Sequence, residues 1–98
     1  MANPKPCHRD TDARVCGAST IVVGNDDVYC NSLLVSVDRD PNSHGGGNLN
    51  ARNNQVYVHS KLVVNHSPEP ASPDNLCPLP PHCNPLTAEG SPNVFVGD

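Results

Sequence analysis

The side chains best suited to chemistry in this sequence are its five cysteines and five histidines. Three of them stand at nearly the same distance before a polar stretch that leads into a strand-like segment. They are Cys16 before Gly24, His44 before Arg52, and Cys83 before Gly90. If three equivalent segments surround one axis, equivalent side chains meet on that axis. Thiolate and imidazole groups are the ligands that zinc prefers, so the spacing predicts a metal site.

A tetrahedral zinc site needs a fourth ligand, and the proline-rich segment 77–83 supplies the candidates. It contains Cys77 and His82 in addition to Cys83. Adjacent residues of an extended chain point to opposite sides, so His82 and Cys83 are not expected to reach the same ion. Cys77 is therefore the preferred fourth ligand, and His82 is the alternative. Zinc is favoured over iron because mixed Cys and His sets are its usual environment.

The redox state of the cysteines is predicted from the N-terminus and from their number. Residues 1–6 lack the apolar stretch of a signal peptide, and no apolar run approaches the roughly 20 residues that span a bilayer. We therefore expect synthesis in a cytoplasm, where thiols stay reduced. An odd number of cysteines also favours metal ligation over a disulfide scaffold. Cys30 is expected to be a small core residue, and His8, His59 and His66 to be solvated or hydrogen-bonded.

The elements that must position these ligands form a short unit present three times. Each aromatic residue stands in the middle of a similar tripeptide that follows a polar, turn-forming stretch. The tripeptides are Val28-Tyr29-Cys30, Val56-Tyr57-Val58 and Val94-Phe95-Val96. β-Branched and aromatic residues beside Gly, Asn and Asp are typical of strand pairs joined by tight turns. The expected strands are 21–23, 28–30, 33–37, 56–58 and 62–64, and the third copy ends the chain in its third strand.

Composition restricts the fold to one small β-structured domain. With 98 residues, 11 prolines and no tryptophan, the chain is too short for two cores and too rich in proline for long helices. We expect a single all-β domain over 1–98, with units over 9–38, 39–66 and 67–98 that share one interior around a pseudo-threefold axis. The loops between the units carry most of the prolines, which stiffen them.

Several functional classes find no support in the sequence. A net charge of −4, with Lys and Arg scattered singly, offers no basic surface for nucleic acid. The glycine run 45–47 is followed by no Lys-Ser/Thr pair and is not a phosphate loop. None of the common nucleophile, zinc-protease or nucleotide-binding motifs is present. We therefore expect neither an enzyme nor a small-molecule substrate.

Over residues 9–98 the chain resembles the PAAR-repeat proteins, which form the conical tip of the spike in contractile phage tails and type VI secretion systems. The clearest similarity is the segment 90–97, which is similar to the family's strand-turn unit. The Pro-Ala-Ala-Arg tetrapeptide is absent, and segments 34–37 and 62–65 stand in its places. Without an added toxin or adaptor domain, the chain is most similar to the free-standing tips of T-even-type phages.

This resemblance implies a zinc near the vertex of a small cone, held in the family by three His and one Cys. It assigns Cys83 to the family's Cys, and His44, Cys16 and Cys77 to its three His. It also implies a structural role in a virion: one copy at the tip of the baseplate spike caps a trimeric β-helical spike protein. During puncture of the host envelope such a tip makes transient contact with the target outer membrane.

Two other functions remain open at this point. The first is a zinc-dependent adaptor that binds a protein or peptide through its β-surface and takes no part in puncture. The second is a small hydrolase, which has the weaker support because so thin a core can hardly enclose a substrate pocket. A complex of one chain with three spike subunits favours the tip over the adaptor.

Overall fold

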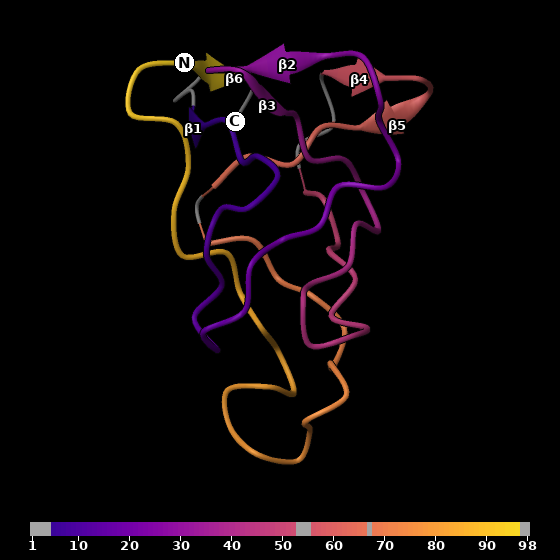
Figure 1. Ribbon diagram of the computed structural model, residues 1–98, viewed down its shortest axis with the longest axis vertical. Helices are drawn as coiled ribbons and strands as arrows, with labels where there is room; N and C mark the ends of the chain where they lie inside the picture. Colours follow the sequence, from indigo (N-terminus) through magenta and orange to yellow (C-terminus); the bar gives the residue numbers. More distant parts are fainter. Residues whose placement is uncertain (1–4, 53–55, 67, 97–98) are drawn as a thin grey trace.

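The computed structural model describes residues 5–52, 56–66 and 68–96, and within these ranges the chain is all-β, with no helix. Its six strands have two residues each and form three antiparallel pairs (Figure 1). They are β1 (Lys5–Pro6), β2 (Tyr29–Cys30), β3 (Leu33–Leu34), β4 (Tyr57–Val58), β5 (Lys61–Leu62) and β6 (Phe95–Val96). The all-β prediction is confirmed. The predicted turn residues 53–55, and the chain end at 97–98, lie outside the described residues.

Two of the three pairs are hairpins with the same tight turn. The residues between β2 and β3, Asn31 and Ser32, both have positive φ, and so do His59 and Ser60 between β4 and β5. Two consecutive residues with positive φ are characteristic of the turn whose twist matches that of a hairpin. The similar flanks of the first two repeat units thus fold into the same local structure.

The third pair joins the two ends of the chain. β6 pairs with β1, so that Phe95 lies opposite Pro6 as Tyr29 lies opposite Leu34 in the first hairpin. The N-terminal segment thus supplies the partner strand of the third aromatic strand, the place that β3 and β5 take in the two hairpins.

A ring of three backbone hydrogen bonds lies directly behind the strand pairs. The His8 N–H donates to the Val64 carbonyl, the Val64 N–H to the Ser36 carbonyl, and the Ser36 N–H to the His8 carbonyl, with N···O distances of 3.2, 2.9 and 2.9 Å. All three residues are fully buried. His8, Ser36 and Val64 each lie two residues after the end of a strand, β1, β3 and β5. Because the third bond returns to the first residue, the three strand pairs surround a common centre.

The apolar core is small, as the composition predicts, and polar groups fill much of the interior. One cluster behind the strands contains Cys7, Cys30, Val35 and Val63, and a second contains Leu49, Val64 and Ala71. The buried Arg14 donates hydrogen bonds to the carbonyls of Gly47, Pro85 and Asp40 and to the Thr20 hydroxyl. One guanidinium thus joins segments of all three units.

One predicted strand is absent. Residues 21–23 are not paired in a sheet, and the Ile21 and Val23 side chains are exposed. The N–H groups of Val22 and Val23 instead donate to the carboxylates of Asp10 and Asp40. The two carboxylates accept the hydrogen bonds that a partner strand would otherwise accept. The apolar residues 21–23 alone do not show which kind of acceptor their N–H groups will have.

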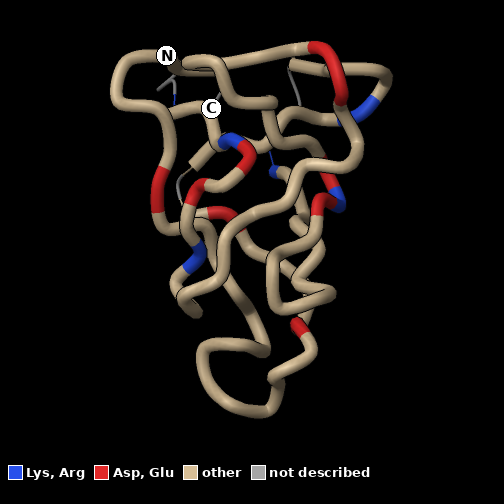
Figure 2. The backbone as a smooth tube through the Cα atoms, in the orientation of Figure 1, with Lys and Arg blue, Asp and Glu red and all other residues tan. Residues whose placement is uncertain are grey.

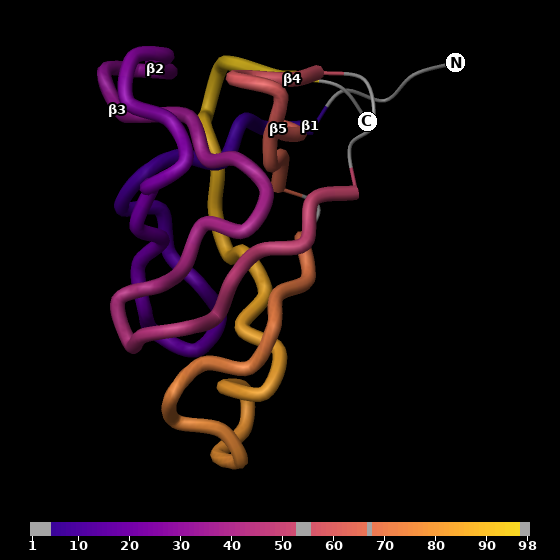
Figure 3. The backbone as a smooth tube through the Cα atoms, turned by 90° about the vertical axis from the view of Figure 1, so that its right-hand side faces the viewer, coloured from indigo at the N-terminus to yellow at the C-terminus, as the bar shows by residue number. Residues whose placement is uncertain are grey.

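The strands lie at the broad end of the molecule, and the chain narrows toward a loop at the opposite end (Figures 1 and 3). The molecule measures 36 × 29 × 23 Å along its principal axes. This apical loop, residues 72–85, comes from the third unit and is longer than the corresponding turns of the other two. Figure 2 shows acidic and basic residues along the body, whereas the apical loop contains a single charged carboxylate, Asp74.

Candidate metal centre

Four side chains that can hold a metal ion meet where the apical loop joins the body. They are Cys16, His44, Asp74 and His82, and one potential ligand atom from each lies within 4.8 Å of those of the others. Asp74 is buried and the other three are half-buried. The group combines one residue from each of the first two units with two from the third.

The Asp74 carboxylate lies at the centre of this group. Its Oδ2 atom is 3.6 Å from Cys16 Sγ, 3.2 Å from His44 Nδ1 and 3.2 Å from His82 Nδ1. Cys16 Sγ is also 3.8 Å from His44 Nδ1. The sulfur, nitrogen and oxygen atoms therefore converge on one small volume.

These separations fit a tetrahedral metal site. With zinc–ligand distances of about 2.0–2.3 Å, the ligand atoms of a tetrahedron are about 3.3–3.8 Å apart. The four distances given above, 3.2 to 3.8 Å, fall close to that range. A thiolate, two imidazoles and a carboxylate are also a donor set that zinc accepts. The four residues can therefore hold a metal ion.

Repeat-related turns position the first two ligands. Cys16 and His44 are 28 residues apart, the same separation as their units. Each is followed by a glycine with φ near +90°, and the N–H groups of Gly17 and Gly45 close tight turns on the carbonyls of Arg14 and Asn42. The left-handed conformation is one that glycine adopts without strain. This shared turn is why the same offset finds both ligands in the sequence.

The apical loop positions the other two ligands. The Asp74 N–H donates to the His82 carbonyl at 2.9 Å, which closes the loop between the two ligands. The Leu76 N–H donates to Asp74 Oδ1 at 2.9 Å and leaves Oδ2 directed at the cluster. A disulfide joins Cys77 and Cys83 within the same loop.

The structure corrects part of the predicted ligand set. It brings Cys16, His44 and the alternative candidate His82 together, whereas Cys77 and Cys83 are bonded to each other. Metal ligation requires a thiolate, which a disulfide sulfur is not. His82 and Cys83 do point to different partners, as expected for adjacent residues, but the imidazole rather than the sulfur faces the site. The sequence analysis did not predict Asp74 as a ligand, because its burial cannot be inferred from the sequence.

Burial and hydrogen bonding act against each other on the Asp74 carboxyl. Burial raises its pKa, but hydrogen bonds from the Leu76 N–H and from the side chains of His82, Asn42 and His44 outweigh this effect. The pKa of Asp74 is therefore held well below its usual range. Burial, and the neighbouring Asp74 carboxylate, raise the pKa of the Cys16 thiol. A bound cation would favour the thiolate form.

The Asn42 side chain is hydrogen-bonded to the candidate ligands. Its Nδ2 atom donates to Asp74 Oδ2 at 3.1 Å, and its Oδ1 atom accepts from the His44 N–H at 2.9 Å. Nδ2 is also 3.9 Å from Cys16 Sγ, so the buried Asn42 contacts three of the four candidate ligands. Such supporting contacts orient the ligands of metal sites.

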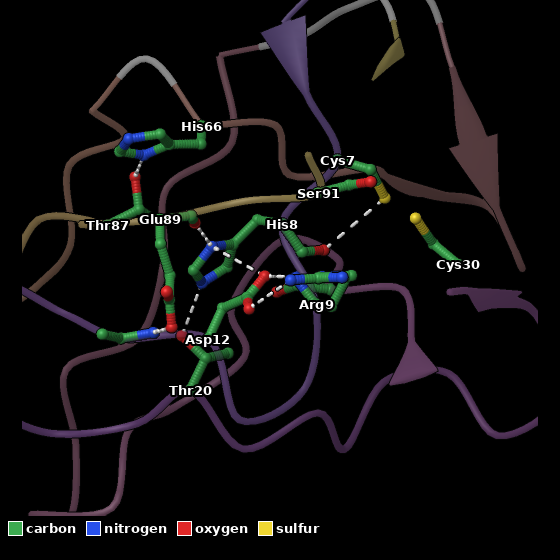
Figure 4. Close-up of polar contacts among 12 residues, drawn as sticks. Cys7, His8, Arg9, Asp12, Thr20, Cys30, His66, Thr87, Glu89 and Ser91 are labelled. Carbon is green, nitrogen blue, oxygen red and sulfur yellow. Dashed lines mark hydrogen bonds and ion pairs between the residues drawn. The ribbon is translucent and has the colours of Figure 1, made fainter. Parts of the chain in front are cut away.

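A second group of titratable residues lies behind the strands at the other end (Figure 4). His8 Nδ1 is 2.8 Å from the Glu89 carbonyl, which only accepts, so Nδ1 carries the proton of the neutral ring. Its Nε2 accepts from the Thr20 hydroxyl at 2.6 Å. Burial lowers the pKa of His8 to about 4. This histidine is hydrogen-bonded, as expected, and lies apart from the candidate metal centre.

The three remaining cysteines are free, and two of them belong to the core. Cys7 and Cys30 are buried in one cluster, and Figure 4 shows their side chains pointing toward one another. Burial, with the neighbouring Cys30, raises the pKa of Cys7 to about 12. The expectation that Cys30 is a core residue is confirmed.

Comparisons with known proteins give no match: no protein-family model fits the chain, and neither does any curated protein. In the described part of the chain, no helix has the length and apolar character required to cross a membrane.

Proposed function

We propose that this protein is a structural tip without catalytic activity, which caps a threefold symmetric partner through its strand-bearing end and is stabilised at the other end by zinc. The partner is expected to be a trimeric β-helical spike protein of a contractile injection apparatus, one tip per trimer. In this role the protein sharpens the spike for puncture of a cell envelope and travels with the virion.

The observation that carries the proposal is the set of three equivalent strand pairs at one end of the molecule. Each pair presents one large, exposed aromatic side chain: Tyr29 is 61% exposed, Tyr57 59% and Phe95 52%. Aromatic residues dominate the energetics of protein interfaces, and isolated monomers rarely leave several of them uncovered. Three such residues on equivalent strands match a partner with three equivalent chains.

The proposed zinc closes the opposite end. Cys16, His44, Asp74 and His82 would hold the ion, which supplies cross-links between three segments of a chain with little apolar core. A structural site with four protein ligands contributes directly to the free energy of folding. Such a closed site suits a rigid tip, because no open coordination position is needed.

Copurification tests the proposal. The tagged chain, expressed with the other structural proteins of its source, is expected to form a complex with three copies of a β-helical subunit, measured by native mass spectrometry. A complex with a single copy of a partner would favour the alternative, a zinc-dependent adaptor that binds proteins through its β-surface. The adaptor is the weaker candidate because it does not require three equivalent aromatic positions.

Metal analysis tests the zinc separately. The purified protein is expected to contain close to one zinc per chain by elemental analysis. A map of anomalous scattering would identify the ion and its ligands together. Protein that contains no metal after purification without chelators, and that takes up none, would contradict this part of the proposal.

A further inference from the structure

The apical loop contains both a pair of candidate ligands and the only disulfide among the described residues. His82 directly precedes Cys83. Leu76, whose N–H orients the Asp74 carboxylate, directly precedes Cys77. Cys83 is therefore bonded through the backbone to the candidate ligand His82, and Cys77 to Leu76, which orients the candidate ligand Asp74.

Residues 72–75 and Asn84 of the apical loop are hydrogen-bonded to the body, but its far part, residues 76–83, has fewer contacts outside the loop. In the described part of the chain, the backbone hydrogen bonds of residues 76–83 all stay within residues 74–84. The apolar side chains Leu76 and Leu79 are exposed. Residues 76–83 are tied to the candidate metal centre through Asp74, which contacts the Leu76 N–H and both the carbonyl and the ring of His82. The ring of His44 also packs near that of His82. Beside these hydrogen bonds, the disulfide is the covalent restraint that holds residues 77 and 83 together.

We infer that the Cys77–Cys83 disulfide controls the metal centre: reduction of the disulfide releases the apical loop and lowers the affinity of the centre for zinc. This inference rests on the metal binding stated under the proposed function. Cys83 is exposed and Cys77 half-buried, so a small reductant can reach the bond.

The reaction is thiol–disulfide exchange with a low-molecular-weight dithiol. One thiolate of the dithiol attacks the exposed Cys83 sulfur, the bond between the cysteine sulfurs breaks, and Cys77 leaves as a thiolate that takes up a proton. The second thiol of the reductant then displaces Cys83. The protein gains two electrons and two protons, and the dithiol is oxidised to a cyclic disulfide.

The coupling acts in both directions. If the disulfide raises the affinity for zinc by some factor, bound zinc must favour the disulfide over the dithiol by the same factor. A protein loaded with metal would therefore resist reduction, and a reduced protein would lose its metal more readily.

The alternative outcome of reduction is that the freed thiolates enter the site. Cys83 adjoins His82, and thiolates are strong zinc ligands, so a reduced loop that rearranged could bind zinc more tightly. The double variant C77S/C83S separates the two outcomes, because it lacks the disulfide and lacks the thiols.

Zinc affinity is measured by competition with a chromophoric chelator for the oxidised chain, for the reduced chain after removal of the reductant, and for C77S/C83S. We expect the reduced chain and C77S/C83S to bind zinc at least about tenfold more weakly than the oxidised chain, the loss typical when a supporting contact of a metal site is removed. Hydrogen exchange at His8, Ser36 and Val64 reports whether the rest of the fold is intact.

Each other result has a definite meaning. Equal affinity of the oxidised chain and C77S/C83S overturns the inference and leaves zinc binding intact. Tighter binding by the reduced chain than by C77S/C83S also overturns it, in favour of thiolate entry. If the oxidised chain binds no zinc, the proposed metal site itself fails, and this inference fails with it.

Discussion

Asp74 and His82 contact each other twice, once through the backbone and once through the side chains. The Asp74 N–H donates to the His82 carbonyl at 2.9 Å, and Asp74 Oδ2 lies 3.2 Å from His82 Nδ1. The backbone contact fixes the distance between the two residues, and the side-chain contact directs both groups to the same point. The pair is therefore held in position before a metal arrives, which reduces the entropy cost of binding.

Removal of the central carboxylate tests the metal site directly. Asp74→Ala is expected to lower zinc affinity by more than the roughly tenfold to hundredfold loss that follows removal of an outer contact, because a ligand itself is lost. Competition titration with a chelator measures the change. The matched control is Asp26→Ala at the exposed group Asp26, Asp27 and His59, which should leave tight binding unchanged. Equal losses in the two variants would place the zinc elsewhere.

A pair of glycine substitutions tests the supporting role of Asn42. Gly47 has φ of +66°, and a Cβ atom there would overlap the Asn42 side-chain amide. Gly47→Ala is therefore expected to displace Asn42 from Asp74 and weaken zinc binding about tenfold. Gly17→Ala measures the effect of backbone strain alone in the turn that positions Cys16, since φ there is also positive but no atom lies within 4 Å of the added Cβ, and its loss of affinity should be smaller. If both variants lose zinc affinity equally, backbone strain rather than Asn42 is responsible.

The buried guanidinium should be essential for stability. Arg14→Met leaves the carbonyls of Gly47, Pro85 and Asp40 without their donor, and the expected cost is about 3 kcal/mol or more. Denaturant titration measures the free energy of unfolding. Arg39→Met is the control, because its side chain is 84% exposed and its loss should change stability by less than about 0.5 kcal/mol. Similar effects of both substitutions would show that the three carbonyls find other partners.

His8 predicts how stability depends on pH. Burial lowers the pKa of His8 from 6.5 to about 4 in the folded protein; the nearby Asp12 opposes this shift, while Arg14 and His66 add to it. Between these two pKa values the unfolded chain binds a proton that the folded chain does not. The free energy of unfolding is therefore unaffected by the titration of His8 above pH 6.5 and falls as the pH is lowered from 6.5 toward 4. The total decrease is about 3 kcal/mol, at 1.36 kcal/mol per pKa unit.

Urea midpoints recorded between pH 4 and 7 measure this dependence. The variant His8→Gln cannot titrate, and its midpoint should change less over the same range. If the variant loses stability in acid as steeply as the natural chain, other groups cause the loss.

The exposed aromatics should matter for partner binding and little for the fold. Replacement of Tyr29, Tyr57 and Phe95 together by Ser is expected to abolish copurification of the threefold partner. Each exposed substitution should change the free energy of unfolding by only about 0.5 kcal/mol. Leu79→Ser is the control, since Leu79 is as exposed as Tyr29 but lies in the apical loop. Retention of the partner by the triple variant would move the interface away from the strands.

The sequence predicted the parts of the protein that repeat and missed the parts that do not. Cys16 and His44 could be found because one turn, closed by a glycine, occurs in both units. Asp74 could not, because an aspartate in a loop is usually solvated, and only the packing of the loop against Asn42 and the two histidines buries it. Cys77 and Cys83 were assigned to the metal because residue type alone does not distinguish a thiolate ligand from half of a disulfide.

The pairing of β1 with β6 was equally hidden in the sequence. The strand at Lys5–Pro6 has two residues, one of them a proline, and no alternating pattern. Its position is set by contacts with the far end of the chain, where the Cys7 N–H donates to the Val94 carbonyl at 2.9 Å. The residue types of a two-residue segment do not indicate that its partner strand lies at the far end of the chain.

The ring formed by His8, Ser36 and Val64 also limits how this architecture can change its size. A solenoid repeat protein can be longer by one unit, because the new unit stacks on the free end of the last one. Here every backbone donor of the ring already meets an acceptor of the ring, and the last bond returns to the first residue. A fourth unit would have no free donor or acceptor of the ring to bond to, so the number of units is fixed at three. Additional residues can be accommodated only in longer loops, as in the apical loop of the third unit.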